Sequence, residues 1–177
     1  MRNFILLVAL AILSSSCISQ KSLERKSDFK ANLFQKESFE GLYENAVPEE
    51  EGNYSLWQDL YKNKSFKDQA FIADFTQVEL ELVSDKLLKA NLYRRGRLED
   101  TIELKGKIRS GYFVVDRKLT LIPLPIFYYQ KELKTILGND NDGNLVLVQG
   151  KMTEYVYFLS LFGGDRDTVT ARYAKLD

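Results

Sequence analysis

Apolar and polar side chains alternate along most of the chain from Gln69 onward. A period of two is the pattern of a β-strand with one buried face. The clearest example is the segment 102–108, in which Ile102, Leu104 and Ile108 alternate with charged residues. Counted over residues 39–177, such runs predict about eight or nine strands.

Short polar or glycine-containing segments separate these runs and predict tight turns. They lie at residues 84–85, 94–97, 110–111, 138–143 and 163–165, the last expected to be the turn of the final hairpin. Successive hairpins produce an antiparallel meander. The segment 119–129 is apolar on both faces and contains Pro123 and Pro125, each of which removes a backbone donor, so we expect it at a sheet edge or a closure point and not in the middle of a sheet.

One short stretch has a helical period instead. Leu56, Trp57, Leu60 and Tyr61 follow the i, i+3, i+4 spacing of an amphipathic helix, and Ser55 stands where an N-cap is expected. The fold expected is therefore all-β, an antiparallel up-and-down barrel with one short helix near its start, because closure removes exposed edges. A two-sheet β-sandwich is the alternative.

The first residues have a different character. Arg2 gives a basic start, residues 4–13 are an uninterrupted apolar run, and three serines follow. A bilayer core of about 30 Å needs about 20 helical residues, so this run is too short to be a permanent span. A basic start, a short apolar run and small residues before a cleavage point indicate a secretory signal peptide over residues 1–16.

Cys17, the only cysteine, follows Ser15 and Ser16 directly. This arrangement resembles the leader of bacterial lipoproteins, although Ser14 stands where that family usually has an aliphatic residue. The resemblance implies that Cys17 is acylated and becomes the first residue after cleavage. Residues 17–38 are then an acylated cysteine with a flexible tether, and residues 39–177 are the β-barrel domain. The protein would be lipid-anchored in the cell envelope, at the outer membrane or the periplasmic face. The alternative is ordinary cleavage, which leaves a soluble protein with a free thiol.

The barrel expected for residues 39–177 loosely resembles a lipocalin, with an early glycine and tyrosine at Gly41 and Tyr43. The tryptophan that the family usually has beside this glycine is missing. The resemblance is therefore architectural, and no ligand-binding residue is carried over from it.

Composition narrows the function. The chain has 25 basic and 25 acidic residues, which gives no general attraction to nucleic acid. It has no histidine, so it lacks both the usual general base near neutral pH and the commonest metal ligand. With Cys17 committed to lipid, no thiolate remains. We therefore expect a protein that is not an enzyme and that uses no metal and no cofactor.

The remaining chemistry is aromatic. We expect the walls of a barrel pocket at five aromatic residues, Trp57, Phe127, Tyr129, Tyr155 and Tyr157. The function expected is that of a membrane-anchored lipoprotein whose barrel binds a small apolar or lipid-like ligand. The alternative is a structural lipoprotein with a filled core that binds an envelope protein and no small ligand.

Overall fold

The computed structural model describes residues 18–27, 34–46, 55–66, 75–124, 126–157 and 161–176. The expected signal peptide, residues 1–16, and the expected lipidation site, Cys17, lie outside these residues.

Antiparallel strands make up most of the described chain. They are β1 (Gly41–Glu44), β2 (Thr76–Ser84), β3 (Leu87–Arg94), β4 (Arg97–Arg109), β5 (Tyr112–Val115), β6 (Lys118–Leu124), β7 (Phe127–Asn139), β8 (Leu145–Tyr157), β9 (Leu161–Tyr173) and β10 (Lys175–Leu176). They form one sheet in the order β10-β1-β2-β3-β4-β5-β7-β8-β9, and β6 pairs with β7 beside this path. The all-β antiparallel prediction is confirmed.

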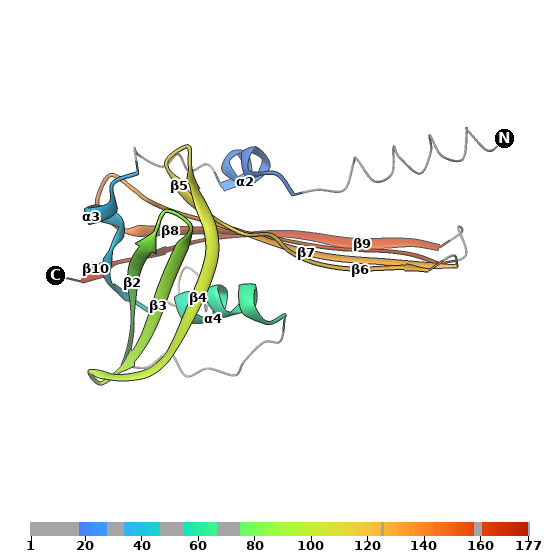
Figure 1. Cartoon of the computed structure of the whole chain (residues 1–177). Coiled ribbons are helices and arrows are strands. Elements are labelled where there is room, and N and C mark those ends of the chain that lie inside the picture. Colours follow the sequence, from blue (N-terminus) through green and yellow to red (C-terminus); the bar gives the residue numbers. More distant parts are fainter. Residues whose placement is uncertain are drawn as a thin grey trace.

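The sheet curves around a helix but does not close into a hydrogen-bonded ring (Figure 1). The two ends of its path, β9 and β10, are successive strands of the chain, separated by Ala174. Ala174 therefore joins one end of the sheet, β9, to the other end, β10, which pairs with β1. The structure is therefore barrel-like, whereas the closed up-and-down barrel expected from the sequence does not form.

Helix α4 (Leu56–Lys64) fills the inside of the curve, as Figure 1 shows. The Ser55 hydroxyl oxygen accepts a hydrogen bond from the Gln58 backbone N–H at 3.3 Å, so the predicted N-cap is confirmed. Leu56, Trp57 and Leu60 are buried in the main hydrophobic core. Around them pack buried side chains from the sheet, among them Tyr43, Val78, Leu88, Ile102, Phe113, Leu147 and Tyr173.

A buried polar network fixes α4 to the sheet. The Tyr173 hydroxyl donates to Asp59 Oδ2 at 3.1 Å, and Gln149 Nε2 donates to the Asp59 backbone carbonyl at 2.9 Å. Lys62 forms an ion pair with the same Asp59 carboxylate at 2.8 Å. Because these groups satisfy one another's hydrogen bonds, the network holds α4 in a defined position on the sheet.

The hairpin turn expected at residues 163–165 is wrong. Gly163 and Gly164 lie inside β9, where they pair with Tyr155 and Glu154 of β8. A Cβ atom at Gly163 would lie 2.2 Å from the Cζ of Tyr155, so the glycine makes room for that ring and does not make a turn. The edge position expected for residues 119–129 is correct for residues 119–124 in β6, which among the described strands pairs with β7 alone. It is wrong for residues 127–129, which lie in β7 between β6 and β8, and Pro125 lies outside the described residues.

A second, smaller core lies on the convex face of the sheet, under helix α2 (Gln20–Ser27). Leu23 is buried there, with Ile18 packed beside it. The sheet contributes Tyr112, Val114, Ile136, Val146 and Val148. The range 17–38, expected to be a flexible tether, thus includes a helix packed on the sheet, and also the one-turn helix α3 (Lys36–Phe39) with Phe39 buried.

Gly150 of β8 decides how closely α2 approaches. A Cβ at this position would lie 2.6 Å from Leu23 Cδ2 and 3.1 Å from Ile18 Cγ2. We predict that Gly150→Val displaces α2 and loses the burial of Leu23, about 1.5–3 kcal/mol of local stabilisation. Hydrogen exchange of residues 20–27 should become faster, while the β2–β4 amides should keep their protection. Unchanged exchange in α2 would contradict this packing.

Candidate functional site

The outer halves of β6–β9 extend beyond α4 as a single layer of sheet (Figure 1). None of residues 119–130 and 155–164 is charged. We call the described part of these two segments the sheet tip: residues 119–124, 126–130, 155–157 and 161–164. Large apolar side chains are exposed there, with Phe162 at 71%, Leu124 at 56% and Ile126 at 55%. Exposed apolar surface of this extent usually marks a contact site.

Four of the five residues predicted as pocket walls lie together on one face of this tip. In the ladder, Phe127 faces Tyr157 and Tyr129 faces Tyr155. The Phe127 and Tyr129 ring centroids are 6.4 Å apart and nearly parallel, and the Phe127 and Tyr157 centroids are also 6.4 Å apart, edge to face. Ile122 and Leu124 of β6 extend this aromatic face to the sheet edge.

The fifth residue, Trp57, lies elsewhere. It sits on α4 in the main core with 2% of its surface exposed. Its backbone N–H donates to Asn45 Oδ1 at 2.8 Å. The structure therefore separates Trp57 from the four tip aromatics, and the five do not form one pocket.

The opposite face of the tip is apolar as well. Alternation along the strands places on it Leu119, Leu121, Pro123, Tyr128, Val156 and Phe162, with the polar Gln130 and the neighbouring Glu154–Arg166 ion pair at its inner end. Leu119 and Leu121 are about 40% exposed. Unlike an ordinary sheet, which buries one face and hydrates the other, the tip presents apolar side chains on both sides.

Three lysines lie directly behind the tip on the aromatic face. Lys118, Lys131 and Lys151 come from three neighbouring strands, and we call them the lysine belt. The Lys118 and Lys131 ammonium groups each lie 4.5 Å from the centre of the Phe66 ring. Partial burial, and secondarily the charge of Lys131, lower the pKa of Lys118. Lys131 and Lys151 also line a cavity of about 280 Å³ with Asp167.

On the opposite face, at the same height along β7, lies the buried Glu132. Its Oε1 accepts a hydrogen bond from the Ile18 backbone N–H at 3.3 Å. Its Oε2 is buried with no hydrogen-bond partner among the described residues. Burial raises the pKa of the Glu132 carboxyl, and the nearby Arg117, the Ile18 N–H and Lys134 offset part of this effect.

This buried carboxyl predicts a pH-dependent stability. The folded state holds the Glu132 proton to a higher pH than the unfolded chain, whose ordinary value is near 4.5. Stability is therefore lost as the pH rises from that value through the folded pKa, by about 1.4 kcal/mol per unit of pKa difference. Glu132→Gln cannot titrate, so the free energy of unfolding of the variant relative to the wild type should rise with pH over this window.

Urea unfolding at a series of pH values measures this difference. Glu103→Gln, at an exposed position on β4, is the matched control for the removal of one carboxylate. A constant difference for Glu132→Gln would contradict the assignment.

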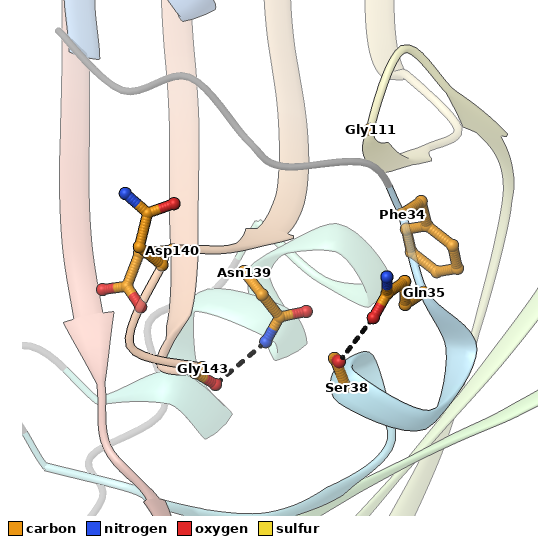
Figure 2. Close-up of a pocket in the computed structure, with 8 residues that line it drawn as sticks. Phe34, Gln35, Ser38, Gly111, Asn139, Asp140 and Gly143 are labelled. Carbon is orange, nitrogen blue, oxygen red and sulfur yellow. Dashed lines mark hydrogen bonds between the residues drawn. The ribbon is translucent and has the colours of Figure 1, made fainter.

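Another cavity, of about 460 Å³, lies between the start of α3 and the β7–β8 turn (Figure 2). Figure 2 shows Asn139 donating to the Gly143 carbonyl and Ser38 donating to Gln35, at 3.1 and 3.3 Å. Asp140 Oδ1 accepts from the backbone N–H groups of Asp142 and Asn144. These polar groups hold the turn itself, so the cavity presents no activated nucleophile or acid–base pair.

Among the residues that the structure describes, no three His, Cys, Asp or Glu side chains are grouped so as to hold a metal ion. No helix there is both long enough and apolar enough to cross a bilayer. Comparison of the chain with protein-family models, with curated proteins and with solved structures gives no match.

Sequence reasoning found the tip aromatics but missed the lysine belt and Glu132. The belt follows from strand register, which places residues 118 and 151 on either side of Leu133 and residue 131 two positions along β7 on the same face. One signal for the tip was present in the sequence: two uncharged segments, 119–130 and 155–164, in a chain with 28% charged residues.

Proposed function

We propose that this chain is an exported lipoprotein, acylated at Cys17 and anchored in the cell envelope, whose domain acts through its outer surface. The observation that supports this proposal best is the contrast between the interior and the tip. The inside of the curved sheet is occupied by α4, whereas Tyr155, Tyr157 and Phe162 of the tip are exposed and Phe127 and Tyr129 are half-buried.

This contrast favours the filled-core alternative over an internal carrier. The Tyr155 and Tyr157 side chains are 46% and 44% exposed, so they lie ready to contact a partner. Trp57, Leu56 and Leu60 are buried in the main core, where side chains of the sheet pack around them. The contact surface of the proposed lipoprotein is therefore the sheet tip.

The lipid anchor is tested by metabolic labelling with a fatty-acid analogue. The wild-type chain should be labelled, and Cys17→Ala should lose the label completely, because the only thiol in the sequence is gone. Ser14→Leu, which restores the aliphatic residue usual in lipoprotein leaders, is the matched control and should be labelled at least as strongly. Persistent labelling of Cys17→Ala would place the lipid elsewhere, and an unlabelled wild type would overturn the anchor.

A further inference from the structure

The geometry points to a lipid bilayer as the partner of the sheet tip. We propose that the tip enters the interface of an anionic membrane, with the lysine belt at the level of the headgroups. The orientation of the tip relative to acyl chains on Cys17 rests on the lipoprotein function proposed above. The affinity of the tip for lipid does not depend on that function.

The first argument is that both faces of the tip are apolar. A protein partner docking on one face would leave the other face hydrated, and that face would then have no need of its exposed leucines and Phe162. A bilayer surrounds an inserted element on all sides. Aromatic residues, tyrosine above all, suit the boundary between acyl chains and headgroups, and the aromatic face holds three tyrosines and one phenylalanine.

The second argument is the position of the charges. Charged residues begin where the uncharged tip ends: the lysine belt with Asp165 and Asp167 on the aromatic face, and the Glu154–Arg166 ion pair on the opposite face. Long lysine side chains reach headgroup phosphates while their stems stay in apolar surroundings. Each lysine near an anionic membrane surface contributes about 1 kcal/mol of attraction. From Lys131 to Phe127 is four residues, or about 13 Å at the rise of a β-strand, which is less than half the hydrocarbon thickness.

The free strand edges also limit how deeply the tip enters the membrane. On its outer side β6 has no neighbouring strand in the described structure. Unpaired backbone groups are costly in hydrocarbon, so the tip should stay in the interface and not span the membrane. Pro123 lowers this cost on the exposed edge because it has no N–H group.

The third argument is where the described chain begins. Ile18 is held by Glu132 and lies next to Gly150, so the described chain begins on the sheet itself. Glu132 and Lys131 are consecutive in β7, so they lie at nearly the same height along the strand. The described chain therefore begins at the level of Lys131, and the sheet tip lies beyond it.

Tryptophan fluorescence in vesicles with brominated acyl chains tests this proposal. Three variants of the acylated full-length protein, each in a Trp57→Phe background, carry a single tryptophan: Tyr157→Trp on the aromatic face, Phe162→Trp on the opposite face, and Leu98→Trp as the matched exposed control on β4. The vesicles contain phosphatidylcholine and phosphatidylglycerol. We expect the bromines to quench residues 157 and 162 by about half or more, since both faces lie at the acyl boundary, and to leave residue 98 unquenched.

Every other outcome overturns the proposal. Quenching at 157 without 162, or the reverse, would mean that a single face docks and that a bilayer does not surround the tip. Quenching at neither position would point to a protein partner or a second copy of the chain. Fatty-acid labelling of the same samples separates the two proposals. Labelled protein with an unquenched tip would support the lipid anchor and contradict insertion of the tip. An unlabelled chain with a quenched tip would support insertion of the tip and contradict the lipid anchor.

Discussion

Replacing Trp57 by alanine should lower the free energy of unfolding by about 3–5 kcal/mol, the range observed when a large buried aromatic side chain is removed from a core. The indole ring lies on the inner side of α4 with 2% of its surface exposed, so its removal leaves a cavity that the surrounding core cannot fill. A loss of this size is a large part of the total stability of a typical domain. Chemical denaturation followed by far-UV circular dichroism measures it.

Tyr61→Ala, on the same helix but half-buried, is the matched control and should cost clearly less. The comparison distinguishes a core residue from a ligand contact. If Trp57 lined a binding pocket, its replacement would leave the stability nearly unchanged and remove binding of an apolar ligand instead. That result would restore the pocket predicted from the sequence.

Placing one carboxylate on each face of the tip should weaken binding to anionic vesicles by about 30-fold. The variant is Tyr157→Glu combined with Phe162→Glu, and each charge held at an anionic membrane surface is worth about 1 kcal/mol, here as repulsion. The folded state should tolerate both changes, because the two side chains are 44% and 71% exposed. The assay is co-sedimentation of residues 18–177, which contain every residue of the two hydrophobic cores, so that no acyl chain contributes.

Val83→Glu combined with Leu98→Glu adds the same charge at exposed apolar positions away from the tip and serves as the control. It should weaken binding only through general repulsion from the anionic surface. Thermal unfolding of both double variants checks that the fold is kept. Equal losses in the two variants would show that net charge, and not insertion of the tip, governs the attraction.

The local elements of this fold were largely readable from the sequence. The helical period of Leu56, Trp57 and Leu60, together with Ser55 as N-cap, predicted α4, because its apolar stripe faces the core as a surface helix normally does. Turns at residues 84–85, 94–97, 110–111 and 138–143 also separate the strands observed. These features are determined by residues that are close together in the sequence, so the local pattern predicts them.

Features that depend on distant parts of the chain were not readable. Gly163 and Gly164 have the composition of a turn, yet they serve a cross-strand contact with Tyr155, and only the register of β8 against β9 reveals it. Likewise, Leu23 and Ile18 stand in a polar segment that reads as a linker. Their apolar partners, among them Tyr112 and Val148, are about 90 to 130 residues away.

The tip shows why an apolar pattern did not decide between burial and exposure. A segment that is apolar on both faces, such as 119–129, is normally a strand buried on both sides. Here β7, β8 and β9 are 13 residues long, more than the curve around α4 can cover, and their outer halves extend beyond the core. The length of these paired strands, and not their composition, places outside the core the four aromatics that the sequence had assigned to an internal pocket.

The central claim is that apolar molecules meet this protein at its tip and not inside its curved sheet. The most direct test is titration of the wild-type chain with a brominated fatty acid in the absence of vesicles, with the emission of Trp57, the only tryptophan, as the signal. Because α4 fills the interior, we predict that the emission of Trp57 stays unchanged throughout the titration. Saturable quenching of Trp57 would show that a ligand enters the core, and it would contradict the account.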